Sequence, residues 1–404
     1  MFRDKFIVVG ITGSIAAYKG AELVSYLKKR GARVQCIMTK AAREFITPLT
    51  LRTLSQNPVI TNMFSEPEHW NVEHIGLAEA ADLFMIVPAT ANLIGKVCSG
   101  IADDFLTTTI MATRAPVLIA PAMNVNMYLN PITQDNIAKL KKQGYNFVDP
   151  EYGDLACGTK GQGRLAELEV LVSEAEKLLV KDKLLLGKKV LVTAGPTREA
   201  LDPVRYLTNR SSGKMGYAIA KQAYLLGADV TLISGPTEIK KFPGIELIKV
   251  ETAREMYEAV FSKGENCQVI IKAAAVADYR PKKESAAKIK KQSVDLNIEL
   301  TRNPDILAEL GKNKGKKILV GFAAETENML DYALEKVHNK NLDFIVANDV
   351  TREGAGFGED TNIVTIIFPN GTKKELGKLD KVDVAKEILK EVVSELVQRK
   401  LDIE

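Results

Sequence analysis

The sequence predicts an α/β protein with two doubly wound layers, one following the other along the chain. Residues 5–14 and 188–197 open in the same way, with a lysine, a short apolar β-branched run and then Gly or Pro before a helix-like pattern. Such an opening is typical of a buried parallel strand that leads into a ligand-facing loop. The 404-residue chain is also longer than one hydrophobic core usually spans. We therefore expect two domains, 1–187 and 188–404, joined where the helical pattern of 168–179 ends.

The composition is that of an ordinary globular protein, and it excludes several classes. The 55 Lys and Arg residues nearly balance the 51 Asp and Glu residues, giving a net charge of +4, so no nucleic-acid partner is indicated. No apolar run reaches the ~18 residues of a membrane span, and the N-terminal run is too short for a signal peptide. Cys36, Cys98, Cys157 and Cys267 show no CxxC spacing, which argues against a disulfide framework or a zinc site and fits a reducing cytoplasm.

In the first half, short apolar runs alternate with helical patterns, which predicts a parallel sheet with helices on both faces. Small, hydroxyl and amide residues follow several of these strands, and ligands of such sheets bind at the carboxyl ends of the strands. For the loop at Gly13 and Ser14 alone, a plain tight turn capped by the serine is an equally good interpretation. The expected strands are 6–10, 33–38, 82–87, 116–120 and 145–148, and the residues expected at the site are Gly13, Ser14, Thr39, Pro88, Ala89, Thr90, Asn92 and Asn124.

Few residues of this half could move a proton. His69 lies in a polar loop, whereas His74 begins an apolar helix, where a lone histidine is more often a cap or a surface residue. A free cysteine is usually buried, as we expect for Cys36 and Cys98. Cys157 lies instead in a glycine-rich stretch, which predicts an exposed loop that can close over a ligand.

Taken together, these motifs resemble the flavin-dependent cysteine decarboxylases. More narrowly, they are similar to the N-terminal half of the bifunctional phosphopantothenoylcysteine decarboxylase/phosphopantothenate–cysteine ligases of coenzyme A synthesis. The resemblance implies a flavodoxin-like domain that holds FMN with the strand-end residues given above. One departure is Tyr128, which stands where the family pattern ends in Trp, and this affects packing more than activity. The motifs that carry the resemblance are 13–19, 74–75, 88–92, 121–127 and 156–158.

The resemblance also implies a reaction and a role for three residues. FMN oxidises the CH2–SH group of 4'-phosphopantothenoylcysteine to a thioaldehyde, CO2 leaves, and reduced FMN returns the hydride. In this reaction His74 assists deprotonation of the thiol and Asn124 holds the substrate carboxylate. Cys157 donates a proton to the enethiolate that remains after CO2 has left. A thiol with a reference pKa of about 8.5 is mostly protonated at neutral pH, which suits a proton donor.

The second half repeats the α/β pattern and adds an antiparallel edge. Its expected strands are followed by an apolar run at 363–368 and the turn residues Asn370 and Gly371, which predict a hairpin. A helix over 382–399 is expected to close the domain. The other expected strands are 189–193, 229–234, 246–250, 269–274, 318–322 and 344–347.

Three stretches of this half could contact a nucleotide. Residues 209–216 are not a P-loop, because Thr208 and Met215 break the GxxxxGK[ST] pattern, yet a glycine-rich helix start remains a site for an anion. The small residues at 273–275 leave room for a ring or a sugar, and Asp278 could hold a hydroxyl or a metal ion. Tight packing of strand and helix is an equally good interpretation there, and a lysine run such as 282–291 is usually only solvated.

These motifs are similar to the ligase half of the same bifunctional family, a Rossmann-like domain. The resemblance implies that CTP activates 4'-phosphopantothenate as an acyl-cytidylate, with Mg2+ (or Mn2+), before L-cysteine displaces CMP. It makes Asn209 the residue that holds the acyl-cytidylate, Lys288 the cation that aids its formation, and Asp278 a candidate metal ligand. The CTP contacts implied are Ala273, Ala274, Ala275, Asp278, Lys288, Asn303, Pro304, Asp305, Ile306, Phe322, Lys336 and Lys340.

The same resemblance implies a homo-oligomer, in which decarboxylase trimers are linked through ligase dimers into a dodecamer.

Other classes of protein fit the sequence less well. A pair of NAD-binding domains lacks the G-x-G-x-x-G motif and the following acid. A non-catalytic flavoprotein would not need both His74 and Cys157. An enzyme with only one active half is a further alternative, and assaying CO2 release and CTP-dependent pyrophosphate release on one preparation distinguishes it from a bifunctional enzyme.

Overall fold

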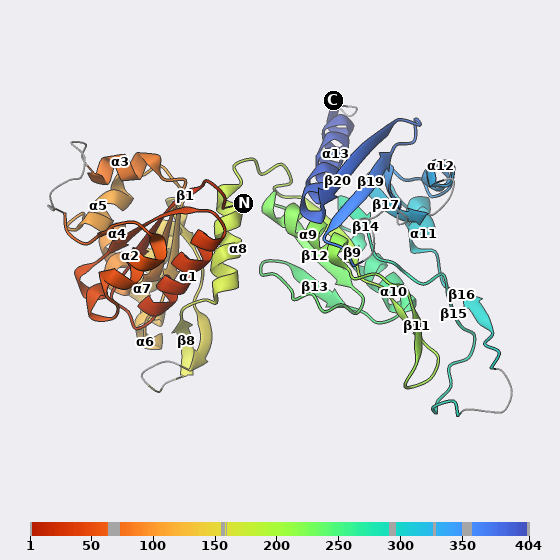
Figure 1. Cartoon of the computed structure of the whole chain (residues 1–404), viewed down its shortest axis with the longest axis horizontal. Coiled ribbons are helices and arrows are strands. Elements are labelled where there is room, and N and C mark those ends of the chain that lie inside the picture. Colours follow the sequence, from red (N-terminus) through yellow and green to blue (C-terminus); the bar gives the residue numbers. More distant parts are fainter. Residues whose placement is uncertain are drawn as a thin grey trace. The chain divides into compact units, whose positions relative to one another are not determined.

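The structure, a computed structural model, describes residues 2–63, 73–154, 158, 160–290, 296–325, 329–349 and 358–401. The chain divides into two compact units, Met1–Lys181 and Asp182–Glu404 (Figure 1). The second unit thus begins six residues before the predicted boundary at 187/188. The reason is that Leu185 is fully buried and its N–H donates to the carbonyl of Leu226 at 3.0 Å, inside the second unit.

The first unit is built on a parallel sheet in the order β3-β2-β1-β4-β5-β6. Alternate residues of β1 enter different cores: Ile7 and Val9 pack with α1 and α8, and Val8 packs with α4 and α5. Both faces of the sheet are therefore covered, as predicted. The elements are β1 (Phe6–Ile11), α1 (Ala17–Lys29), β2 (Arg33–Met38), η1 (Lys40–Glu44), α2 (Pro48–Ser55), β3 (Val59–Ile60), α3 (Glu73–Ala80), β4 (Leu83–Ala89), α4 (Ala91–Cys98), α5 (Phe105–Ala112), β5 (Val117–Pro121), α6 (Val125–Leu129), α7 (Pro131–Lys142), β6 (Asn146–Phe147) and α8 (Leu168–Leu179).

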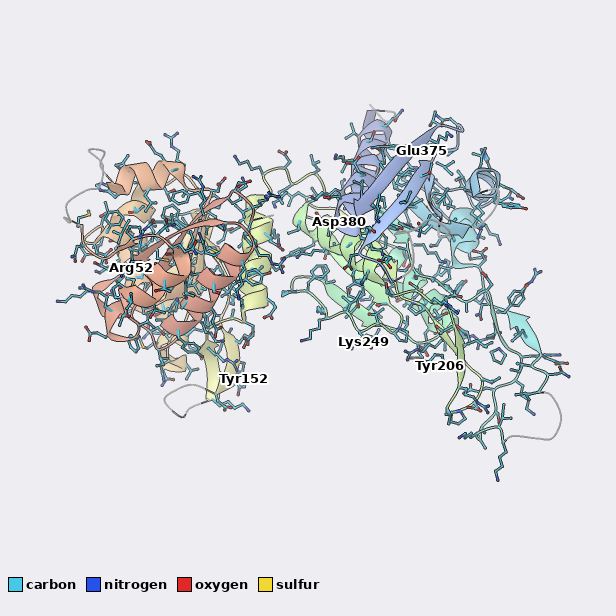
Figure 2. All side chains as sticks on the ribbon, viewed as in Figure 1. Arg52, Tyr152, Tyr206, Lys249, Glu375 and Asp380 are labelled. Carbon is cyan, nitrogen blue, oxygen red and sulfur yellow. The ribbon has the colours of Figure 1, made fainter. Side chains whose placement is uncertain are left out.

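An antiparallel hairpin, β7 (Glu151–Asp154) and β8 (Lys160–Arg164), frames the glycine-rich stretch. These two strands were not predicted, because the sequence there indicates only a loop. Tyr152 on β7 is exposed, as is Tyr206 in the second unit (Figure 2). Cys157 lies outside the described residues, as does His69. Cys36 in β2 and Cys98 in α4 are buried free cysteines, as predicted.

The second unit has an eight-stranded sheet in the order β13-β12-β9-β14-β17-β18-β19-β20. The first six strands are parallel, and β19 and β20 add the antiparallel edge hairpin that the sequence predicted. The elements are β9 (Lys189–Ala194), α9 (Lys214–Leu225), β12 (Asp229–Ser234), β13 (Glu246–Lys249), α10 (Ala253–Gly264), β14 (Val269–Lys272), α11 (Ile306–Lys312), β17 (Ile318–Glu325), α12 (Met329–Asn339), β18 (Phe344–Asp349), β19 (Thr361–Ile367), β20 (Lys373–Asp380) and α13 (Lys381–Leu401).

Two short antiparallel pairs extend from this unit and were not predicted. They are β10 (Arg198–Ala200) with β11 (Tyr206–Thr208), and β15 (Tyr279–Pro281) with β16 (Leu300–Arg302). Among the described residues, no helix combines the length and the apolar composition that a membrane span requires.

Candidate active sites

In the first unit, the carboxyl ends of three strands meet along one edge. The Thr12 hydroxyl donates to the Pro88 carbonyl at 2.8 Å and accepts from the Thr90 N–H at 3.0 Å, which joins the ends of β1 and β4. The Thr39 N–H donates to the Ile11 carbonyl at 3.1 Å, which joins the end of β2 to that of β1. The turns that contain Ser14, Thr39 and Thr90 therefore lie next to one another.

The hydroxyl groups of these turns all serve as acceptors for backbone N–H groups. Thr39 caps η1 by accepting from Ala42, Thr90 caps α4 by accepting from Leu93, and Ser14 accepts from Ala16. A hydroxyl that accepts one hydrogen bond can still donate its own proton, and phosphate oxygens are suitable acceptors. The edge can therefore bind a phosphorylated cofactor through neutral donors.

A hollow of about 430 Å³ lies beside this edge. Ser14 and Asn124 both line it, together with the cations of Lys19 and Arg164. Asn124 is held in place as the N-cap of α6, where its carbonyl oxygen accepts from the Asn126 N–H at 2.9 Å. The hollow thus presents an amide and two cations, and both cations also pair with Glu167, Lys19 at 3.5 Å.

The β7–β8 hairpin forms one wall of this hollow. Gly163 lines it, and its carbonyl accepts from the Met123 N–H at 3.1 Å. The base of the hairpin, whose strands flank Cys157 in the sequence, is therefore fixed next to Asn124.

His74 is the predicted catalytic residue that the single chain does not bring to this hollow. It lies at the start of α3, where its ring packs edge-on against Phe105 with centroids 6.2 Å apart. It does not line the hollow, and α3 and the hairpin lie at opposite ends of the unit in Figure 1. Thr39, Pro88, Ala89, Thr90 and Asn92 do not line it either.

In the second unit, the residues after β14 are tied to the ends of β9. The Ala274 N–H donates to the Thr193 hydroxyl at 3.1 Å, and the Ala275 N–H donates to the Gly195 carbonyl at 3.0 Å. The Asn209 amide donates to the Ala275 carbonyl at 3.1 Å. Asn209 and the small residues that follow β14 therefore lie together at the carboxyl ends of the neighbouring strands β9 and β14.

Asp278, Asn303 and Asp305 form a second cluster a few residues further on. The Asn303 N–H donates to the Asp278 carbonyl at 2.8 Å. Asp305 caps α11 and forms an ion pair with Lys340 at 2.7 Å. Burial acts to raise the pKa of Asp305, but the hydrogen bonds from Lys340 and the Ala308 N–H outweigh it, so that the pKa lies below its ordinary value. Asp305 is therefore a carboxylate at neutral pH.

Lys336 and Lys340 line a hollow of about 360 Å³ with Tyr332, Glu335 and Asn339. Phe322 lies on β17 and is partly buried, whereas the Ile306 side chain is in the hydrophobic core, so that a ligand could contact only its backbone.

Lys288 is exposed, and its loop is held by contacts with the β10–β11 turn. The N–H of Ile289 donates to the Asp202 carboxylate at 3.1 Å, and the Ile289 carbonyl accepts from Arg205 at 2.8 Å. The Arg205 hydrogen bond holds the pKa of Asp202 well below its ordinary value. These contacts do not bring Lys288 to Asp278.

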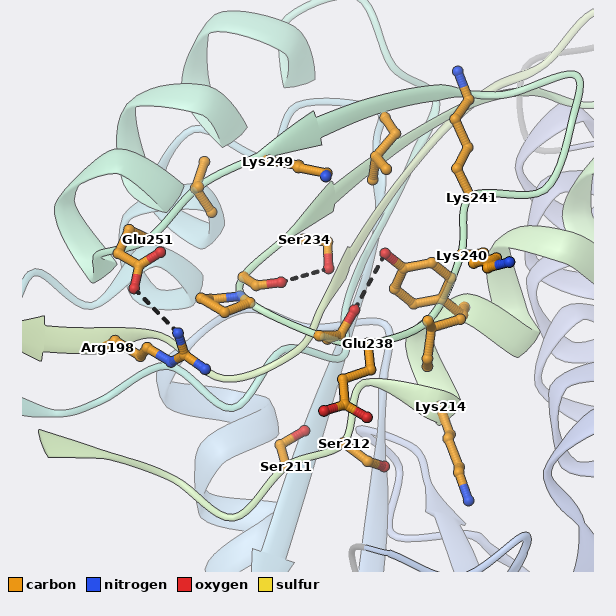
Figure 3. Close-up of a pocket in the computed structure, with 17 residues that line it drawn as sticks. Arg198, Ser211, Ser212, Lys214, Ser234, Glu238, Lys240, Lys241, Lys249 and Glu251 are labelled. Atoms are coloured by element: carbon orange, nitrogen blue, oxygen red, sulfur yellow. Dashed lines mark hydrogen bonds and ion pairs between the residues drawn. The ribbon is translucent and has the colours of Figure 1, made fainter. Parts of the chain in front are cut away.

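Another hollow of the second unit, of about 920 Å³, lies at the start of α9 (Figure 3). It collects cations from different elements, including Lys214 on α9 and Lys249 on β13. One of the cations, Arg198, is paired with Glu251 at 3.6 Å. The lining includes Arg198, Ser211, Ser212, Lys214, Lys240 and Lys249.

Both halves of the chain match known family models. Residues 1–180 match the model described as Flavoprotein, and residues 185–396 match the DNA/pantothenate metabolism flavoprotein C-terminal domain. The coenzyme A biosynthesis bifunctional protein CoaBC of Bacillus subtilis (strain 168) is 50% identical over 397 residues, which cover 98% of each chain. The chain belongs to this bifunctional family. It is therefore an enzyme with a flavoprotein decarboxylase half and a ligase half.

Other members of the family are also similar along most of their length. The CoaBC protein of Escherichia coli (strain K12) is 43% identical, over 91% of this chain and 92% of that protein. A crystal structure of the C-terminal domain of a CoaBC protein is 47% identical and covers 54% of this chain and 100% of that one, with a TM-score of 0.47.

Several cations that line these hollows have no sequence motif that would have pointed to them. Lys240 and Lys249 look like surface lysines in the sequence, and only the order of β12 and β13 in the sheet brings them to the start of α9. Lys19 and Arg164 were missed for the same reason, since they are far apart in sequence and meet only at the hollow beside Asn124.

Proposed function

We propose that the chain carries out two consecutive steps of coenzyme A synthesis. The second unit joins 4'-phosphopantothenate to L-cysteine, uses CTP to form an acyl-cytidylate, and releases pyrophosphate and CMP. The first unit converts the product, 4'-phosphopantothenoylcysteine, to 4'-phosphopantetheine and CO2. The observation that supports this most directly is that one chain contains the Asn124 hollow beside the β7–β8 hairpin and, in the second unit, the cluster of Asp278, Asn303, Asp305 and Lys340.

The strand ends of the first unit suit FMN, because they offer neutral hydroxyls and backbone N–H groups to a phosphate. When bound, FMN supplies the two-electron oxidation of the substrate CH2–SH group to a thioaldehyde. The Asn124 amide orients the substrate carboxylate, and Lys19 and Arg164 attract its phosphate. After CO2 leaves, the electron pair is held in an enethiolate, and Cys157 donates a proton to the carbon. The hydride that FMN removed would then return to the resulting thioaldehyde and give the thiol of 4'-phosphopantetheine.

His74 lies away from Asn124 in one chain, so we propose that a second copy completes each decarboxylase site. His74 of one subunit would then face Asn124 of the next, in trimers that ligase dimers link into a dodecamer. Mixing Asn124→Ala and His74→Gln chains tests this arrangement. Mixed oligomers should regain decarboxylation that neither variant shows alone, and no recovery would place both residues at sites within single subunits.

In the second unit, the 4'-phosphopantothenate carboxylate attacks the α-phosphorus of CTP, and the bond to the bridging oxygen breaks as pyrophosphate leaves. The amine of L-cysteine then displaces CMP. Asn209 lies beside the strand-end residue Ala275, which supports the role proposed for it in holding the acyl-cytidylate. Among the described residues no three metal-ligating side chains cluster, so a Mg2+ at Asp278 would take most of its ligands from the triphosphate.

The first experiment is to measure both activities on one preparation. CTP-dependent pyrophosphate release and CO2 release should both appear, and absence of either would show that half to be inactive.

Replacing Lys288 with Gln should slow acyl-cytidylate formation roughly 100-fold, because its cation stabilises charge in the transition state. Lys283→Gln, at an exposed lysine of the same loop, is the matched control and should keep the native rate.

A further inference from the structure

Lys272 is a lysine at the end of an otherwise apolar central strand. It follows Val269, Ile270 and Ile271, which are all buried, in β14. β14 lies between β9 and β17, and Lys272 is opposite Thr193 on one side and Gly321 on the other. Its backbone position thus puts it at the carboxyl edge of the sheet, just before the small residues 273–275.

The surroundings of Lys272 contain two further lysines and two carboxylates. Lys336 and Lys340, at the end of α12, lie within electrostatic range of its ammonium, as do Asp305 at the start of α11 and Asp278 after β14. Asp305 is already paired with Lys340 at 2.7 Å. No described residue accepts a hydrogen bond from Lys272.

Stability of the fold does not account for a lysine in this position. Burial, and then the charge of Lys340, lower the pKa of Lys272 to about 8, against the opposing effect of Asp305 and Asp278. The folded protein therefore disfavours the ammonium form. The Lys272 ammonium lies at the end of β14, near the ammonium groups of Lys336 and Lys340. Three cations in one place suit an anion that carries several negative charges.

We propose that Lys272 contacts the polyphosphate chain of the nucleotide, as the third cation of a lysine triad with Lys336 and Lys340. This rests on the nucleotide use proposed above. As the bond from the α-phosphorus to the bridging oxygen breaks, the electron pair passes to pyrophosphate, and the triad holds the charge that collects there. Lys272 is thus a binding residue for the part of CTP that leaves.

The test compares CTP with CMP in calorimetric titrations of the full-length protein. Lys272→Met should weaken CTP binding roughly 10- to 100-fold, the effect of removing one charge-assisted hydrogen bond, and leave CMP binding within about twofold. Lys312→Met is the matched control, because Lys312 lies on α11, is exposed and, within the described part of the chain, pairs only with Glu309 at 3.1 Å. It should bind both nucleotides as the wild type does.

A second variant keeps the proposal testable if Lys272→Met does not fold. Lys272→Arg stays charged at every accessible pH, so its CTP affinity should be flat between pH 7 and pH 9. Wild-type affinity should fall across this range as Lys272 loses its proton. Asp305, whose pKa lies below its ordinary value, stays ionised throughout, and the other charged groups that face Lys272 are Asp278, Lys336 and Lys340.

The outcomes separate the two proposals. If the wild type neither binds CTP nor releases pyrophosphate from it, the proposed nucleotide chemistry is wrong and the role of Lys272 fails with it. If the wild type is active and Lys272→Met binds CTP equally well, only the role of Lys272 is overturned. Equal losses for CTP and CMP would likewise overturn it, since they would indicate a disturbed strand end.

Discussion

At the scale of single residues, Lys272 is a place where stability and ligand binding favour different side chains. In the unfolded chain its pKa has the ordinary value of 10.5, and in the folded protein it is about 8. Between these values the unfolded chain binds more protons than the folded one, so the free energy of unfolding rises with pH across this window. Below pH 8 the charged side chain remains a cost to the fold.

Lys272→Met should therefore stabilise the nucleotide-free protein at neutral pH. Methionine has a similar length and carries no charge, so the gain should be roughly 1–3 kcal/mol at pH 7 and should shrink towards pH 10. Thermal melting of both proteins at several pH values measures it. A lower melting temperature for the variant at pH 7 would contradict this explanation and would mean that the ammonium stabilises the fold.

Cys157 allows binding to be separated from the last chemical step. In Cys157→Ser we expect flavin to stay bound and CO2 to be released, with the product stalled in an oxidised form, because a hydroxyl is a much poorer proton donor than a thiol. The flavin spectrum, CO2 release and mass spectrometry of the product measure the three steps. Normal turnover by the variant would remove Cys157 from the mechanism.

At the scale of elements, the β7–β8 hairpin contains glycines for two different reasons. Gly158 has a φ of +78°, a value that favours glycine in a turn. Gly163 instead allows close approach, because a Cβ there would lie 2.2 Å from the Met123 carbonyl oxygen, and at Gly161 it would lie 2.6 Å from Val125 Cγ2. The glycines on β8 thus seat the hairpin against the segment that contains Asn124.

Gly163→Ala should push the hairpin away from Asn124 and lower decarboxylation by at least about tenfold, since small displacements of positioned groups are costly in rate. Gly153→Ala on β7 is the matched control. The Cβ added there would be 3.4 Å from a flexible Arg164 atom, which is ordinary contact. CO2 release by both variants measures the effect, and equal rates would show that the seating of the hairpin does not matter.

The elements that the sequence predicted well are those with a long local pattern. The central strands are continuous apolar runs because both faces of the sheet are covered, and α8 has the same bounds in the prediction and the structure. The pairs β10–β11 and β15–β16 have strands of three residues, too short to show any period. The charged neighbours of Lys272 include Asp305, which caps α11, and Lys336 and Lys340 at the end of α12, so its surroundings depend on tertiary packing that no local pattern contains.

At the scale of the whole molecule, each unit has its own sheet and its own cores. The contacts of residues 182–187 show at which residue the fold of the second unit begins. Leu185 is fully buried, its N–H donates to the Leu226 carbonyl, and Lys183 donates to the Leu225 carbonyl at 3.0 Å. Residues 182–187 therefore belong to the fold of the second unit, although the predicted domain ranges assign them to the first domain, 1–187.

Two fragments of the second unit test this division. Residues 182–404 should fold alone and keep pyrophosphate release, because all the contacts of Leu185 are retained. Residues 188–404 lack a fully buried leucine, whose burial is worth roughly 2–3 kcal/mol, so this fragment should melt about 5 °C or more lower. Circular dichroism melts and the pyrophosphate assay on the two fragments compare them. Equal melting temperatures would show that 182–187 is only a linker, and an inactive 182–404 fragment would show that ligase activity depends on the first unit.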